Sequence, residues 1–169
     1  MTQDERDRFE EWVEETYRRV VVDAGEGTIK RAEAIPIVVE QIANDIANGD
    51  LDPPTDLEAI VRRIIERGDD QRRRHHPQDV SYVLDIINGN TILGKDNPWL
   101  DSVCVAGNGV RKSWRFVDGE DLLAMAELKV RMAADAAQAA ADFMRAVTQI
   151  RSYLLRVHGH DALIGDLAP

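Results

Sequence analysis

Positively charged side chains are concentrated in one stretch of this sequence, and they are the residues best suited to binding an anion. Residues 71–117 hold 7 Lys and Arg against 4 Asp and Glu, whereas the whole chain has a net charge of −10. Lys and Arg neutralise phosphate groups and donate hydrogen bonds to them. Six cations of this stretch form two short runs, namely Arg72, Arg73, Arg74, Arg111, Lys112 and Arg115. We therefore expect an anionic partner to bind here.

The second run belongs to a predicted β-hairpin, SVCVAGNGVRKSWRFV, over residues 102–117. Valine and aromatic residues favour strands, and GNG at 107–109 favours a tight turn because Asn and Gly tolerate positive φ. Successive side chains of a strand point to opposite faces, so Arg111 and Arg115 share one face. The face of Lys112 stays open, because a bulge near the turn would shift the register. We expect one face to pack on the protein and the other to point outward with its arginines.

The other reactive side chains do not match a known catalytic or metal-binding pattern. His75 and His76 are adjacent, so they point in different directions, and we expect them to be solvated loop residues. Cys104 lies in a strand among apolar neighbours and is expected to be a small buried hydrophobe. AGNGVRKS lacks the GxxxxGK[ST] spacing of a phosphate-binding loop. The sequence therefore predicts a protein that is not an enzyme and binds no cofactor and no metal.

Four helices are predicted ahead of the hairpin, over about residues 4–23, 28–48, 55–68 and 78–88. In each of them apolar residues recur at spacings of three and four, as on one face of an amphipathic helix. Pro36 either kinks the second helix or lies in the first turn of a helix that restarts there. Gly68 is predicted to follow the end of the third helix. The polar stretch DDQRRRHHPQD after it is expected to be a loop.

A single long helix is predicted from residue 118 to about residue 158, because no Gly or Pro occurs between residues 120 and 158. Some forty helical residues span roughly 60 Å, which is too long for packing against a small domain. Apolar side chains recur along it as in a coiled-coil seam, which predicts a homodimer. The predicted dimerisation residues are Met125, Leu128, Met132, Ala136, Ala139, Phe143, Val147, Ile150 and Leu154. The alternative is a helix that folds back as two pieces on the same chain.

The predicted order of helices, hairpin and long helix is typical of a winged helix-turn-helix unit with a C-terminal dimerisation arm. In such a unit one helix enters the major groove of DNA and the hairpin lies beside it on the phosphate backbone. The helix over 78–88 would read bases through Gln78, Ser81 and Tyr82. We therefore expect a mainly α fold with an acidic N-terminal helix over 1–27, a winged-helix-like domain over 28–117 and a dimerisation arm over 118–169.

The segment RKSWRFVDGEDLLAM, followed by an alanine-rich helix, resembles small proteins of actinobacterial phages and prophages. The resemblance covers roughly residues 103–130. It implies a phage-type role, such as a regulator of lysogeny, an inhibitor of a host protein or an assembly factor.

Two functions follow as expectations. The first is a dimeric DNA-binding transcriptional regulator that binds double-stranded DNA through the two cationic runs. The second is a helical protein-interaction module, whose acidic first helix (Glu10, Glu11, Glu14 and Glu15 on one face) meets a basic partner. The charged N-terminus and the lack of an 18-residue apolar run predict a cytoplasmic protein without a membrane span.

Overall fold

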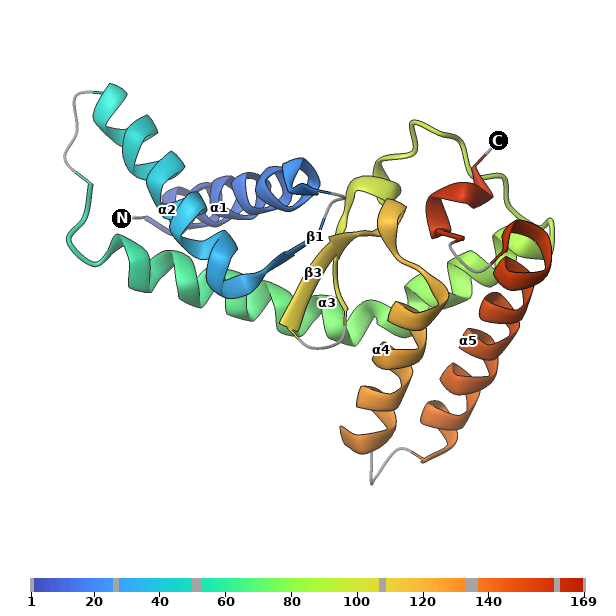
Figure 1. Ribbon diagram of the computed structural model, residues 1–169. Helices are drawn as coiled ribbons and strands as arrows, with labels where there is room; N and C mark the ends of the chain where they lie inside the picture. Colours follow the sequence, from blue (N-terminus) through green and yellow to red (C-terminus); the bar gives the residue numbers. More distant parts are fainter. Residues whose placement is uncertain are drawn as a thin grey trace.

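The protein is mainly helical, with one small antiparallel sheet (Figure 1). The computed structural model describes residues 2–25, 28–49, 53–106, 109–132, 137–159 and 162–168. Within these ranges no helix combines the length and hydropathy needed to cross a membrane.

Two antiparallel helices begin the fold, α1 (Gln3–Asp23) and α2 (Arg31–Asn48), as the apolar periodicity predicts. A capping box starts α1: the Thr2 hydroxyl accepts a hydrogen bond from the Glu5 amide, and the Glu5 side chain accepts one from the Thr2 amide. Pro36 lies inside α2, which begins five residues earlier, so the helix does not restart at the proline.

The third helix, α3 (Leu57–Ile87), is one continuous element of 31 residues, about 46 Å long. The prediction of two shorter helices joined by a loop is therefore wrong. Gly68, predicted to follow the third helix, and Pro77, which precedes the predicted fourth helix, both lie inside α3. Consequently the turn that would precede a DNA-reading helix is absent from this described stretch, and residues 78–87 are the end of a long helix.

The pairing of the two predicted hairpin strands is confirmed, and a third strand joins them, but residues 114–116, expected in the second strand, form a 3₁₀ helix. Residues 107 and 108 of the predicted turn lie outside the described residues. Strands β2 (Val103–Val105) and β3 (Val110–Ser113) pair antiparallel, and β1 (Thr28–Lys30) pairs with the other edge of β3, giving the order β1-β3-β2. Short 3₁₀ helices flank the pair, η2 (Pro98–Asp101) before it and η4 (Trp114–Phe116) after it. The hairpin is thus part of a three-stranded sheet.

The long C-terminal helix is two helices, α4 (Gly119–Met132) and α5 (Ala137–His158), which lie side by side and antiparallel (Figure 1). The prediction of a continuous arm is wrong, and the fold-back alternative is confirmed. A 3₁₀ helix, η5 (Ile164–Leu167), follows and packs on η4.

Most residues of the predicted dimer seam are enclosed by the chain's own helices. The buried members are Met125, Phe143, Val147, Ile150 and Leu154. Leu128 is half-buried and Ala139 is exposed, whereas Ala136 and the Met132 side chain lie outside the described part of the structure. The five buried side chains therefore form the contact between α4, α5 and α3, and they are not available to a second subunit.

Two hydrophobic clusters divide the interior, and α3 contributes to both. The first cluster, cluster A, joins α1, α2 and the N-terminal half of α3, with side chains such as Tyr17, Ile42 and Ile65. The second cluster, cluster B, joins the C-terminal half of α3 with α4, α5 and η4 through residues such as Val83, Trp114 and Ile150. The sheet lies at the junction, beside the middle of α3 (Figure 1).

Candidate functional site

Two of the predicted DNA-binding cations converge, but they converge on a buried carboxylate. Asp69 is fully buried in the middle of α3. Its Oδ2 accepts a hydrogen bond from Nε of Arg111 at 2.9 Å, and its Oδ1 accepts one from Nη1 of Arg72 at 3.2 Å. The Tyr17 hydroxyl donates to the same Oδ1 at 3.3 Å, and burial raises the pKa of this phenol. This network ties α1, α3 and β3 together.

The expectation that the arginine face of β3 points outward is wrong. Arg111 is only 2% exposed, because its face of the strand packs against α3 and α1. Lys112, on the opposite face, donates to Asp121 of α4 at 2.6 Å. Arg115 donates to Asp101 at 3.1 Å. The hairpin cations therefore hold the sheet to its neighbours.

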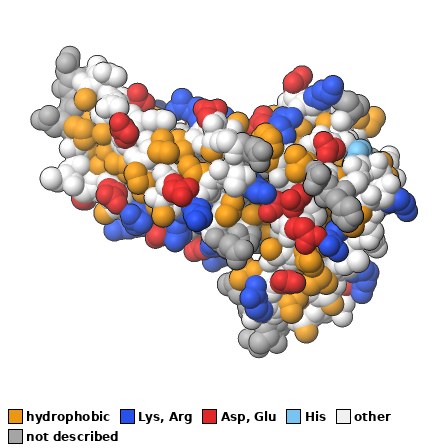
Figure 2. Space-filling model, viewed as in Figure 1, with side chains coloured by type: hydrophobic (Ala, Val, Ile, Leu, Met, Phe, Trp, Pro, Cys, Tyr) orange, Lys and Arg blue, Asp and Glu red, His pale blue; other side chains and the backbone are white. Residues whose placement is uncertain are grey.

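The first cationic run is helical, and most of it is also paired. Arg72 forms a second ion pair with Glu14 of α1, and Arg73 pairs with Asp70 at 2.7 Å. Arg74 is exposed and has no acidic partner among the described residues. On the face shown in Figure 2, Lys and Arg side chains are interspersed with Asp and Glu. The expected basic surface is thus largely neutralised.

The predicted base-reading residues lie at i, i+3 and i+4 of α3 and share one face of the helix, but not all of them are free. Gln78 and Ser81 are exposed on α3, whereas Tyr82 is half-buried. The Tyr82 hydroxyl accepts a hydrogen bond from Nδ2 of Asn97 at 3.2 Å, and its ring lies edge-on to Trp99. Tyr82 therefore helps to hold the loop before the hairpin.

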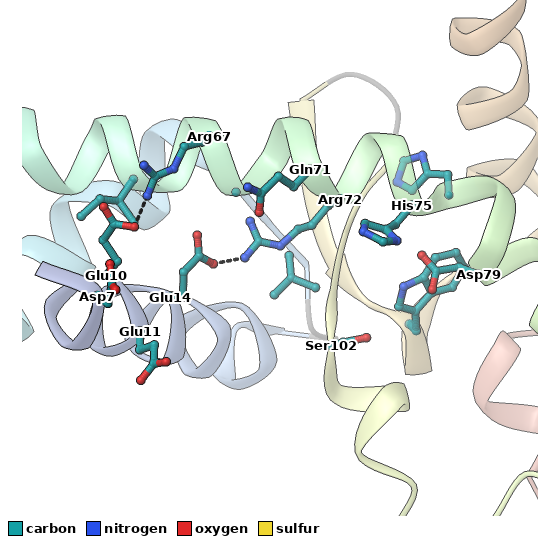
Figure 3. A pocket seen from close by; sticks show the side chains of 15 residues that line it. Asp7, Glu10, Glu11, Glu14, Arg67, Gln71, Arg72, His75, Asp79 and Ser102 are labelled. Atoms are coloured by element: carbon teal, nitrogen blue, oxygen red, sulfur yellow. Dashed lines mark hydrogen bonds and ion pairs between the residues drawn. The ribbon is translucent and has the colours of Figure 1, made fainter. Parts of the chain in front are cut away.

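A groove of about 710 Å³ runs between α1 and α3 and ends at β2 and η4 (Figure 3). We call it the α1–α3 groove. Ile64, Val103 and Trp114 contribute apolar surface to its wall. Gly68 lies between the helices, where a Cβ atom would come within 2.1 Å of Oε1 of Glu14. The glycine therefore makes room for the Glu14–Arg72 ion pair.

Acidic groups outnumber cations along the α1–α3 groove. Its acidic residues are Asp7, Glu10, Glu11, Glu14 and Asp79, against Arg67 and Arg72. Two ion pairs cross the groove, Glu10 with Arg67 and Glu14 with Arg72 (Figure 3). Asp7 and Glu11 have no cationic partner within the described ranges. Burial raises the pKa of Glu14 and of Asp79, although the hydrogen bond from the Trp99 indole opposes this shift at Asp79.

The two histidines behave differently from the prediction of solvated loop residues, because both lie on α3. His75 is exposed beside the groove, but His76 is 5% exposed and its Nε2 has no hydrogen-bond partner. Burial, with Lys129 and Arg73 nearby, lowers the pKa of His76 to about 4. Its ring meets Trp114 edge-on at 6.4 Å between centroids, and Trp114 stacks on Trp99 at 5.0 Å.

Cys104 is buried in β2, as the apolar neighbours predict, and burial raises the pKa of its thiol. A raised pKa keeps the sulfur in its unreactive thiol form. Among the described residues, no group of three His, Cys, Asp or Glu side chains is arranged to hold a metal ion.

Sequence reasoning missed the partners of the cations, because they come from distant parts of the chain. Asp69 and Arg111 are 42 residues apart, and Glu14 and Arg72 are 58 residues apart. The periodicity of α1 does place Glu10, Glu11 and Glu14 on its polar face, but it does not indicate which helix they meet.

No protein-family model, curated protein or solved structure matches this chain.

Proposed function

We propose that this protein is a non-enzymatic interaction module that binds a basic segment of a partner protein in the α1–α3 groove. The observation that carries the proposal is the excess of acidic residues along the groove, two of which, Asp7 and Glu11, have no cationic partner among the described residues. Ile64, Val103 and Trp114 also line the groove and give it an apolar part. Lysine or arginine side chains of a partner would pair with the carboxylates while apolar side chains fill the floor.

The two ion pairs across the groove support this proposal, because they hold its two walls together. Glu10–Arg67 and Glu14–Arg72 join α1 to α3 at successive turns (Figure 3). A groove that is fixed before binding loses little conformational entropy when a partner enters. In a phage-type setting the partner would be a host protein to be inhibited or an assembly component.

A basic, partly apolar peptide labelled with a fluorophore tests the proposal by fluorescence anisotropy. We expect the Asp7→Asn/Glu11→Gln double variant to weaken binding about tenfold at low salt, because two exposed charge contacts are lost. The matched control is Glu40→Gln, which removes one exposed carboxylate from α2, outside the groove. Equal effects of the groove and control variants would reject the groove as the binding site.

The alternative proposal is a winged-helix regulator that binds double-stranded DNA. Its support is the order of elements around the hairpin and the exposed Arg74, near Lys129 of α4. A mobility shift with a DNA duplex separates the two functions. A shift that persists at moderate salt and weakens in Arg74→Ala favours the regulator, whereas no shift favours the interaction module.

The homodimer also stays a proposal. Because the predicted seam is mostly internal, a dimer would have to use other residues. A light-scattering mass of the full chain checks it.

A further inference from the structure

A second hollow, of about 630 Å³, lies between the C-terminal half of α3 and α4. We call it the α3–α4 hollow. Cations of both helices line it, Arg73 and Arg74 from α3 and Lys129 from α4. Asp70 is the one acidic residue among the described lining residues, and it already pairs with Arg73. Arg74 and Lys129 have no acidic partner in the described part of the chain.

A buried residue with an unsatisfied polar atom lines the same hollow. His76 lines it, is 5% exposed, and has no hydrogen-bond partner at Nε2. A buried polar atom without a partner is costly, and a bound molecule is one of the features that can satisfy it. Burial and the neighbouring Lys129 and Arg73 lower the pKa of His76, so the ring is neutral at pH 7. A neutral imidazole accepts or donates one hydrogen bond at Nε2, according to its tautomer.

The rest of the wall is apolar. Met125 and Leu128 of α4 line the hollow beside Lys129. A volume of several hundred Å³ with apolar lining and a few convergent polar groups is typical of small-molecule sites. The ligand that fits therefore has an anionic end and an apolar body.

The net charge of the residues that line the α3–α4 hollow favours one class of anion. With His76 neutral, three cations and one carboxylate leave a net charge of +2. A phosphate monoester carries a charge of about −1.5 to −2 at pH 7, whereas a carboxylate carries −1. Arginine also suits the oxygen geometry of a phosphate group.

We propose that the α3–α4 hollow binds a small organic phosphate monoester, with the phosphate against Arg74 and Lys129 and the organic group against Met125 and Leu128. Nε2 of His76 then gains a partner on the ligand. His76 also lines the α1–α3 groove, but the cations and the apolar side chains of the α3–α4 hollow do not, so the proposal does not depend on the function proposed for the groove.

Calorimetric titration with phenyl phosphate tests the proposal on the full chain. We expect saturable binding, and we expect Arg74→Gln and Lys129→Gln each to weaken it about tenfold, because each removes a charge-assisted hydrogen bond. The matched control is Arg63→Gln, which removes an exposed arginine from α3 outside the hollow and should change the affinity less than about twofold.

Two further probes test the ligand class. Benzoate and inorganic phosphate should both bind more weakly than phenyl phosphate, because one lacks the second charge and the other lacks the apolar body. Phenyl phosphate should also shift the imidazole nitrogen resonances of His76 and leave those of His158, at the end of α5, unchanged. Absence of saturable binding, an equal loss in Arg63→Gln, or benzoate binding as tightly as phenyl phosphate would each overturn the proposal.

Discussion

At the scale of single residues, Asp69 and Asp70 show how much position on a helix matters. They are neighbours in the sequence, and both belong to the polar stretch that the sequence predicts as a loop. In the structure Asp69 is fully buried with three partners, whereas Asp70 is exposed and pairs with Arg73. Neighbouring side chains on a helix point about 100° apart, so only the position of α1 and β3 decides which aspartate is enclosed.

We expect Asp69→Asn to lower the free energy of unfolding by about 3–5 kcal/mol, because it leaves the Arg111 guanidinium buried beside a neutral group. Urea denaturation measures the change. Asp70→Asn is the matched control and should change stability by less than about 0.5 kcal/mol, since its ion pair is exposed. Equal losses in the two variants would contradict the structural role of the buried network.

The lowered pKa of His76 predicts that the free energy of unfolding depends on pH within a defined range. Its pKa in the folded protein is about 4, against 6.5 for an ordinary histidine, so the unfolded chain takes up the proton first as the pH falls. The stability contributed by the neutral ring is present above about pH 6.5 and is lost between pH 6.5 and about pH 4. The loss amounts to about 3 kcal/mol.

The measurement compares the wild type with His76→Gln by denaturation at pH 7 and at pH 4.5 in a phosphate-free buffer. Glu14 and Asp79 have raised pKa values and act in the opposite direction, but they are present in both proteins and cancel in the difference. The wild type should lose more stability on acidification than the variant. Identical losses would show that the imidazole does not titrate as the structure implies.

At the scale of elements, the contact between η5 and η4 depends on a glycine. A Cβ atom at Gly165 would lie 2.6 Å from the carbonyl oxygen of Arg115. Because this oxygen belongs to the backbone, it cannot move away by a side-chain rotation. We therefore expect Gly165→Ala to destabilise the fold by about 1–3 kcal/mol. Gly94→Ala is the control, because nothing lies within 4 Å of its Cβ position, and it should be nearly neutral. Thermal unfolding of both variants checks the difference.

The helices themselves were predictable where an apolar stripe and a clear boundary coincide. The bounds predicted for α1 and α2 agree with the structure to within a few residues. The same reasoning fails for α3, because it ends one helix at Gly68 and begins another after Pro77, whereas α3 continues through both residues. Gly68 instead allows α1 to approach, and pairs at i,i+3, such as Asp69–Arg72 and Asp70–Arg73, support the polar middle of the helix.

The break between α4 and α5 has no marker in the sequence. The stretch between them is rich in alanine and contains neither Gly nor Pro, so local propensity favours continuation. The apolar stripe that suggested a coiled-coil seam is the stripe that packs α4 and α5 together. A pattern of this kind fixes which face is buried, but not whether the covering helix belongs to the same chain.

At the scale of the whole molecule, α3 and the Asp69 network join the two hydrophobic clusters. Ile42 is fully buried in cluster A, and Ile42→Ala should cost about 2–5 kcal/mol. Because α3 passes through both clusters, we expect the loss to be shared, with faster amide hydrogen exchange in α5 as well as in α2. Ile92→Ala, at an 87% exposed position, is the control. Faster exchange confined to α1 and α2 would show that the clusters unfold independently.

The distribution of charge along the chain does not translate into a charged surface. Residues 71–117 carry an excess of cations, yet Arg72, Arg111, Lys112 and Arg115 pair with acidic residues on other elements. A net charge counted over a segment says nothing about which acids fold against it. The candidate binding surfaces therefore depend on the charged side chains that have no partner of opposite charge among the described residues. These are Asp7 and Glu11 at the α1–α3 groove, and Arg74 and Lys129 at the α3–α4 hollow.

The stacked indoles of Trp99 and Trp114, with the His76 ring edge-on to Trp114, give the molecule an intrinsic fluorescent probe in cluster B. Because a protonated imidazole quenches indole emission more strongly than a neutral one does, the brightness of this pair reports the state of His76 directly. Ligand binding in the α1–α3 groove or in the α3–α4 hollow can thus be followed by tryptophan fluorescence, without any attached dye.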